Sequence, residues 1–222
     1  MTYLFYLIVF TLGSSIVSFL TVMAHDFPKI SINRRSSCDH CHKILKWYEL
    51  VPILGFILTS GTCKSCLTKI PIVYPLTESL GGLFFLILLI QDKDLYIAVP
   101  ITLMMILLGF MDHYYGYIYS ILYLLSLPAF IYALLNHYPL HFIAGLLVYT
   151  SLLVLNRVYQ NIGLGDVELL GLLAVIFGLE NILKIILLAC LLCILKFMTD
   201  KKRSFRFIPY LTIATGIVYL IS

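Results

Sequence analysis

Most of this 222-residue chain consists of long apolar runs separated by short polar segments. Many of these runs approach the length of about 20 residues that a helix needs to cross a bilayer. They are apolar throughout rather than alternating, so they predict helices and not the strands of a membrane barrel. We expect eight spanning helices, near residues 3–24, 72–91, 95–111, 118–135, 140–156, 167–180, 182–198 and 207–221.

The composition supports an all-α polytopic membrane protein. Hydrophobic residues make up 61% of the chain and charged residues 12%, whereas soluble domains carry roughly 25% charged residues. The first apolar run lacks a basic segment before it and is too long for a cleaved signal peptide. The net charge of +4 does not predict nucleic-acid binding, because the basic residues gather in two segments for a topological reason.

Those two basic segments predict the orientation in the membrane. Lysine and arginine are retained on the cytoplasmic side, so we place segments 25–71 and 199–206 in the cytoplasm and both termini outside. Two spans separate Asp112 from Asp166, which puts both aspartates on the cytoplasmic side. The basic residues concerned are Lys29, Arg34, Arg35, Lys43, Lys46, Lys64, Lys69, Lys201, Lys202, Arg203 and Arg206.

We divide the chain into a first helix (1–24), a cytoplasmic loop domain (25–71) and a helical bundle (72–222). The loop domain is too small to bury a core of its own, so a covalent or metal cross-link is expected. It contains two Cys-x-x-Cys pairs, Cys38/Cys41 and Cys63/Cys66.

The spacing of the two pairs is typical of a four-thiolate zinc site. Two disulfides are the alternative, although a loop in the reducing cytoplasm disfavours them. His40 or His42 could replace a cysteine ligand, but four thiolates already complete a tetrahedron. Such a closed site is structural, since no position is open to substrate. A further prediction is that the residues between the pairs form a small apolar plug of Trp47, Tyr48, Leu50 and Val51.

A third pair, Cys190 and Cys193, lies inside an apolar run and is expected to pack as small hydrophobic residues.

Ionisable groups inside a membrane are costly and usually functional. The strongest candidates are Asp112, which ends an apolar run, and Asp166 in Gly163-Leu164-Gly165-Asp166. Glycine permits close backbone approach, which could bring Asp166 to a neighbouring helix or an extended substrate. Two carboxylates that meet share a proton, and such a pair can hydrolyse amides: one takes a proton from water and the other hydrogen-bonds the carbonyl under attack.

Two glutamates are weaker candidates. Glu168 is rotated about 200° from Asp166 on a helix and could pair with a basic residue such as Arg157. Glu78 lies about two turns inside its helix, where it could orient the site or a partner helix.

Seven segments together resemble the type 4 prepilin leader peptidases, including the branch that serves competence pseudopilins of Gram-positive bacteria. The similarity covers nearly the whole chain, and the combination of segments is specific although no single one is. The segments are Gly13–Leu20, Ser37–Cys41, Trp47–Ile53, Gly61–Cys66, Tyr74–Glu78, Gly163–Val167 and Ile208–Leu211, the last containing Pro209.

The resemblance implies a polytopic Gly-x-Gly-Asp aspartic endopeptidase with Asp112 and Asp166 as catalytic residues. Its substrates would be prepilins and pseudopilins with a short basic leader, cleaved after a glycine at the cytoplasmic face. Many members also methylate the new N-terminus with S-adenosylmethionine. The family commonly has a lysine two residues after the motif aspartate, where this chain has Glu168.

The sequence is also compatible with two other functions. A relative of signal peptide peptidase or presenilin would also use Gly-x-Gly-Asp, but it would not need the four-cysteine loop. A proton-coupled transporter would use the carboxylates as a relay, although the acids gather near one face and no inverted repeat is evident.

Overall fold

The computed structural model of the protein describes residues 2–28, 35–159, 163–200 and 206–222. Helices dominate these residues, and no strand longer than an isolated bridge occurs among them. The predicted all-α class is therefore confirmed. The chain divides into two compact units, Met1–Asp92 and Lys93–Ser222. Among the basic residues used for the orientation, Lys29, Arg34, Lys201, Lys202 and Arg203 lie outside the described residues.

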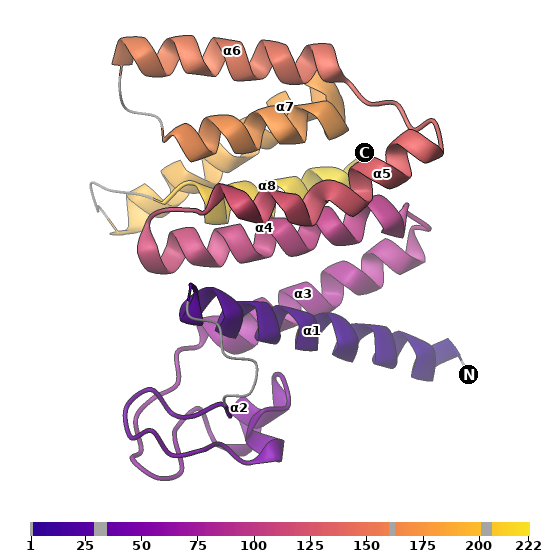
Figure 1. The fold of residues 1–222 in the computed structure, drawn as a ribbon. Helices are drawn as coiled ribbons and strands as arrows, with labels where there is room; N and C mark the ends of the chain where they lie inside the picture. Colours follow the sequence, from indigo (N-terminus) through magenta and orange to yellow (C-terminus); the bar gives the residue numbers. More distant parts are fainter. Residues whose placement is uncertain (1, 29–34, 160–162, 201–205) are drawn as a thin grey trace. The chain divides into compact units, whose positions relative to one another are not determined.

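In the first unit, two long helices pack against each other through small residues. Gly81 meets Val17, and Gly82 meets Ser14. Glycine lets the two backbones approach closely, which is the usual way in which membrane helices associate. The loop domain between these helices contains only short helical turns. The elements are α1 (Thr2–Asp26), the 3₁₀ turn η1 (Trp47–Glu49), α2 (Leu54–Leu58) and α3 (Val73–Ile90) (Figure 1).

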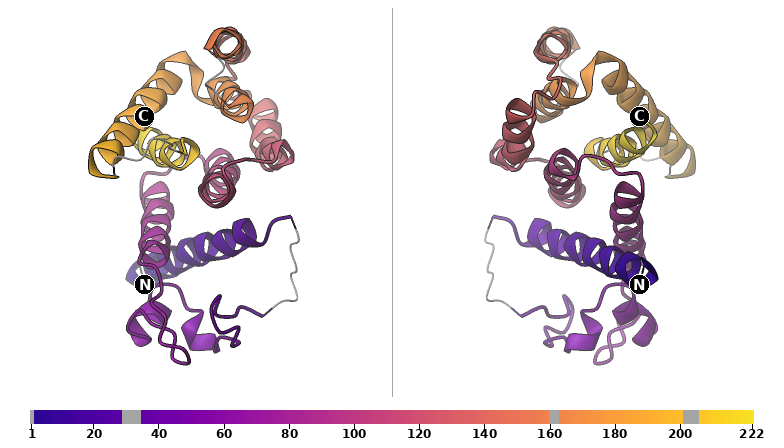
Figure 2. Two further views of the ribbon diagram at one scale, coloured as in Figure 1. Left: turned by 90° about the vertical axis from the view of Figure 1, so that its left-hand side faces the viewer. Right: turned by 90° about the vertical axis from the view of Figure 1, so that its right-hand side faces the viewer.

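The second unit is a helical bundle built around α4. This helix packs against η2, α5 and α8, while α7 packs against α6 and α8. The shared core includes Met104, Leu108, Leu173 and Leu211, which are fully buried. The elements are α4 (Leu95–Tyr115), η2 (Ser120–Ser126), α5 (Leu127–Leu135), α6 (Phe142–Tyr159), α7 (Leu164–Asp200) and α8 (Ile208–Ile221) (Figures 1 and 2).

Five helices in the described residues are long and apolar enough to cross a membrane: α1, α3, α4, α6 and α7. Two shorter apolar stretches, Ser120–Leu135 and Ile208–Ile221, correspond to the predicted spans at 118–135 and 207–221. The predicted spans at 167–180 and 182–198 both fall within α7, which is broken at Gly178. Each of the eight predicted spans therefore has a counterpart, with bounds that differ by a few residues.

The break in α7 is made possible by glycine and by two hydrogen bonds. Gly178 has φ 75° and ψ 173°, a region that essentially only glycine adopts. A broken helix leaves carbonyl groups without their usual partners, which is costly in an apolar environment. Here the Val175 carbonyl accepts the backbone N–H of His141 at 2.7 Å. The Phe177 carbonyl accepts the side-chain amide of Asn181 at 3.2 Å.

This geometry predicts that Gly178→Ala destabilises the bundle. An alanine would be strained at this φ, and its Cβ would lie 3.3 Å from the His141 ring. We expect a loss of about 1–3 kcal/mol in the free energy of unfolding, measured by thermal unfolding of the purified protein in detergent. Leu179→Ala at the neighbouring exposed position is the control and should change the melting temperature less. Equal melting temperatures for the two variants would contradict this account of the break.

Candidate functional site

The loop domain brings the four predicted cysteine ligands together. Their sulfur atoms all lie within 4.8 Å of one another. The Cys38–Cys66 sulfurs are 3.8 Å apart and the Cys41–Cys63 sulfurs 3.9 Å apart. A zinc ion bonded to four sulfurs at about 2.3 Å would hold them about 3.8 Å apart. None of these cysteines forms a disulfide, so the arrangement could hold one metal ion and disfavours the disulfide alternative.

The two cysteine pairs sit in backbone turns of the same geometry. In each turn, the N–H of the first cysteine donates to the carbonyl of the residue five positions later. The carbonyl of the same cysteine accepts the N–H of the residue four positions later. The turn at Cys63 has the same geometry as the turn at Cys38, which lies 25 residues earlier. This repeat is not apparent in the sequence, because the two turns share few residues besides the cysteines. The bonds are Cys38 to Lys43 (3.0 Å), His42 to Cys38 (2.9 Å), Cys63 to Thr68 (2.9 Å) and Leu67 to Cys63 (2.9 Å).

Hydrogen bonding also prepares one ligand for a metal. The Thr68 hydroxyl lies 3.2 Å from the Cys66 sulfur. Hydrogen bonds from the Thr68 side chain and backbone lower the pKa of Cys66 to about 6. The thiolate is the form that binds metals. His40 and His42, the alternative ligands, are exposed.

The predicted apolar plug of the loop is wrong. Trp47 is 79% exposed and Leu50 46% exposed. Backbone bonds close each turn on itself, and the two turns meet at the cysteine cluster. Tyr48 is half-buried, and the ammonium groups of Lys64 and Lys46 lie 4.9 Å and 5.8 Å from its ring centre.

Glu78 has a structural partner within the first unit. Its carboxylate accepts the backbone N–H of Ile53 at 2.8 Å. Ile53 precedes α2 and has a φ of 63°, an unusual value for a β-branched residue. This hydrogen bond fixes the start of α2.

In the second unit, Asp112 lies near the end of α4 and is 8% exposed. Its carboxylate accepts the backbone N–H of Ile208, the first residue of α8, at 3.3 Å. The first N–H groups of a helix lack partners and form its positive end, so an acidic group there is favourable. Pro209, the second residue of α8, has no N–H of its own, and this explains its place in the motif. The guanidinium of Arg206 adds a positive charge that acts on Asp112.

Asp166 lies at the start of α7. At both glycines of its motif, close packing leaves little room for a side chain. The Asp166 carboxylate folds over Gly163, where an added Cβ would come within 3.2 Å of it. An added Cβ on Gly165 would lie 2.7 Å from Ile118. The Gly165 carbonyl accepts the hydroxyl hydrogen of Tyr123 at 3.0 Å. Tyr123 was missed in the sequence because a tyrosine in an apolar run carries no distinguishing signal.

The fold brings the two aspartates near each other. The end of α4 and the starts of α7 and α8 gather on one side of the bundle, at the left of Figure 1. The carboxylates of Asp112 and Asp166 are close enough to interact electrostatically. The fold therefore brings two acidic residues that are far apart in the chain to the same side of the bundle.

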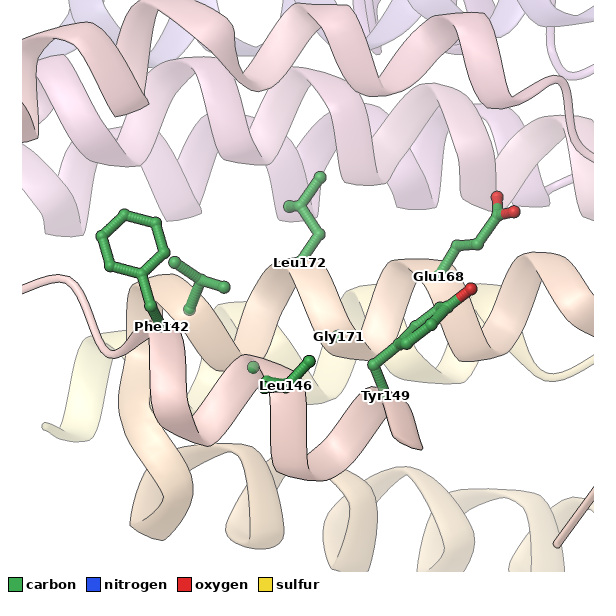
Figure 3. A pocket seen from close by; sticks show the side chains of 8 residues that line it. Phe142, Leu146, Tyr149, Glu168, Gly171 and Leu172 are labelled. Atoms are coloured by element: carbon green, nitrogen blue, oxygen red, sulfur yellow. The ribbon is translucent and has the colours of Figure 1, made fainter. Parts of the chain in front are cut away.

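Glu168 points to a different neighbour. It accepts a hydrogen bond from the Ser120 hydroxyl at 3.1 Å, rather than pairing with Arg157. It also lies at one end of a shallow groove of about 400 Å³ between α6 and α7 (Figure 3). The rest of the groove is mostly apolar and includes Phe142, Leu146 and Leu172.

Residues 11–91 match the family model of the bacterial peptidase A24 N-terminal domain. A relative from Myxococcus xanthus (strain DK1622) is 35% identical over 107 residues, which are 47% of this chain and 32% of the relative. One from Neisseria gonorrhoeae is 29% identical over 83% of this chain and 70% of the relative. One from Bacillus subtilis (strain 168) is 29% identical over 66% of this chain and 62% of the relative.

All three relatives are called prepilin leader peptidase/N-methyltransferase. No solved structure matches the chain. The fold and the cysteine cluster define a helical, multi-pass membrane protein with an A24-type N-terminal region. The chain is similar in sequence to several prepilin leader peptidases. It spans about a third of the first relative and less than two thirds of the third.

The cysteine geometry predicts about one tightly bound metal ion per chain. Cys63→Ser should remove most of it, because Cys63 is the buried ligand and a hydroxyl binds soft metals poorly. Elemental analysis of the purified protein measures the ratio of metal to protein. Cys190→Ser, outside the cluster, is the control and should keep the metal. Metal-free wild-type protein from cells grown with ample metal would contradict the prediction.

Proposed function

We propose that the chain is an aspartic endopeptidase of the bacterial plasma membrane that removes the leader peptide of prepilins or pseudopilins. Cleavage would follow a glycine at the cytoplasmic face. The names of the relatives support the reaction and the substrate class. The observation that carries the proposal is that the end of α4, with Asp112, and the start of α7, with Asp166, lie on the same side of the bundle (Figure 1), because the chemistry needs two carboxylates near each other.

The mechanism uses the pair as a single unit. Two adjacent carboxylates in a partly dry site cannot both ionise easily, so they share one proton. The ionised member takes a proton from a water molecule, whose oxygen attacks the carbonyl carbon of the scissile bond. The protonated member hydrogen-bonds the carbonyl oxygen and thereby stabilises the charge that develops there. The proton then passes to the leaving amine as the C–N bond breaks.

Neighbouring groups prepare this chemistry. The Ile208 N–H holds one oxygen of Asp112, which fixes the orientation of the carboxylate and leaves its other oxygen for water. Gly163 lies exposed beside Asp166, and a residue without a side chain lets an extended substrate backbone come close. The Tyr123 hydroxyl holds the carbonyl of Gly165, so Tyr123 positions the backbone from which Asp166 projects.

The cysteine cluster has a separate task. We infer that its metal is zinc and that its role is structural, because four thiolates leave no open position for water or substrate. The cluster and the A24 match of residues 11–91 favour this function over the presenilin-like and transporter alternatives. The names of the relatives also support N-methylation with S-adenosylmethionine. No glycine-rich cofactor motif accompanies that activity in the sequence, so we assign no residue to it.

Replacement of either aspartate tests the proposal. Asp112→Asn and Asp166→Asn keep the side-chain shape but remove the shared proton, so each should slow cleavage by about 10²–10⁴-fold, the usual contribution of an acid–base group. The measurement is mass spectrometry of a pseudopilin precursor incubated with each purified variant. Glu180→Gln alters an exposed acid paired with Lys184 and should leave the rate unchanged. Full processing by either asparagine variant would defeat the assignment.

Removal of the Tyr123 hydroxyl should have a smaller effect. A single hydrogen bond contributes about 0.5–1.5 kcal/mol, so Tyr123→Phe is expected to reduce cleavage by up to about tenfold. Rates measured over a range of precursor concentrations should show the loss mainly in kcat, since Tyr123 positions Asp166 and does not bind substrate. Tyr117→Phe, which removes an exposed hydroxyl near Tyr119, is the matched control. A loss as large as that of Asp166→Asn would contradict the positioning role.

A further inference from the structure

The short helix α2 presents its apolar side outward. Leu54, Ile57 and Leu58 share one face of the helix and are 55%, 62% and 57% exposed. The inward side carries the small residues Gly55 and Thr59, both buried. A helix on the surface of a soluble domain has the opposite arrangement. The exposed face of α2 therefore requires an apolar surrounding that the loop domain does not supply.

The neighbouring turn extends this apolar surface. An added Cβ on Gly55 would clash with the backbone of Glu49, so η1 and α2 lie directly against each other. Trp47 on η1 and Leu50 just after it are also exposed. Large exposed apolar side chains on two elements that touch are typical of an interaction site. We call the set Trp47, Leu50, Leu54, Ile57 and Leu58 the apolar edge of the loop.

One hydrogen bond sets the level of α2 along α3. Glu78 is the sixth residue of α3, and a helix rises 1.5 Å per residue, so the Cα of Glu78 lies about 7.5 Å along α3 from its start. Its carboxylate lies nearer that start, because helical side chains lean toward the N-terminus. Its bond to the N–H of Ile53 therefore holds the start of α2 beside α3 rather than beyond its end. Figure 1 shows α2 in this position, alongside the α1–α3 pair.

The first turn of α3 indicates where lipid begins. Ile72, Val73 and Leu76 are exposed although apolar, and α3 is a candidate membrane span. If lipid covers these three residues, it extends along α3 as far as the position where Glu78 binds the start of α2. Amphipathic helices at a membrane surface sink about 5–10 Å into the headgroup and acyl boundary, which agrees with the offset along α3.

The charges beside the apolar edge fit a phospholipid surface. Lys46 and Lys64 lie over the ring of Tyr48, next to Trp47. Tryptophan and tyrosine favour the membrane–water interface, and lysine side chains there reach toward anionic headgroups. Within 35–71 the sequence has five basic residues and two acidic ones.

We propose that the apolar edge of the loop inserts into the interface of a bilayer that contains anionic phospholipids. Glu78 sets the depth of α2, and the lysines around Tyr48 bind lipid headgroups. The loop domain is then a membrane-embedded platform rather than a freely hydrated insertion. This role is independent of the proposed peptidase activity.

Trp47 allows a direct test, because it is the only tryptophan of the chain. The full-length protein is placed in vesicles of phosphatidylcholine and phosphatidylglycerol, with bromine on the acyl chains close to the headgroup. We expect the brominated lipids to quench most of the Trp47 fluorescence and aqueous iodide to quench little. Strong quenching by iodide with none by the lipids would overturn the proposal. Weak quenching by both would also overturn it, because protein rather than lipid would then cover Trp47.

Two sets of variants test the details. Glu78→Ala removes the acceptor for Ile53 and should reduce quenching by the brominated lipids, whereas Glu78→Gln keeps an acceptor oxygen and should retain it. Bound metal per chain, measured on the same samples, shows that the loop remains folded. The double variant Trp47→Phe/Leu58→Trp reports on α2 itself and should also be quenched by lipid. Lipid quenching that is unchanged in Glu78→Ala, or absent at Leu58→Trp, would contradict the proposed depth of α2.

Discussion

A backbone polar group inside a membrane has no water to bind, so the protein must supply its partner. This constraint accounts for three of the side-chain contacts described above. Glu78 receives the N–H of Ile53 ahead of α2, and Asp112 receives the N–H of Ile208 at the start of α8. At the break of α7, Asn181 binds the carbonyl of Phe177. In each case a polar side chain supplies the partner of a backbone group at the start of a helix or at a helix break.

The same constraint connects stability to chemistry at the acidic pair. Asp112 satisfies the first turn of α8 with one oxygen, and that bond holds the carboxylate still. Tyr123 also acts on both stability and chemistry. Its hydroxyl donates a hydrogen bond to the Gly165 carbonyl and so stabilises the turn that carries Asp166. In the proposed peptidase, catalytic groups are therefore oriented by bonds that the fold needs in any case. Such rigidity is what a reaction between two carboxylates and one water requires.

The sequence predicted the helices, the cysteine cluster and the two aspartates, because each leaves a local pattern. Apolar length marks a span, and Cys-x-x-Cys spacing marks a ligand pair. The partners of Glu78 and Asp112 left no such pattern, since a backbone N–H is present at every residue except proline. The exposed apolar edge was also missed: Trp47 and Leu50 were expected inside the loop, because an apolar residue in a loop is normally assigned to a core. Only the three-dimensional arrangement shows that Trp47 and Leu50 are not covered by a core of the loop domain.

The cysteine cluster also changes the connection between the first two long helices. Without a metal, a single stretch of chain from residue 27 to residue 72 joins α1 to α3. With Cys38 and Cys66 bound to one ion, the path shortens to residues 27–37 and 67–72. Joining distant residues removes conformational freedom from the unfolded chain, as a disulfide does. The ion would thus act as a reversible cross-link between two membrane helices, so cellular metal supply would influence how readily this pair assembles.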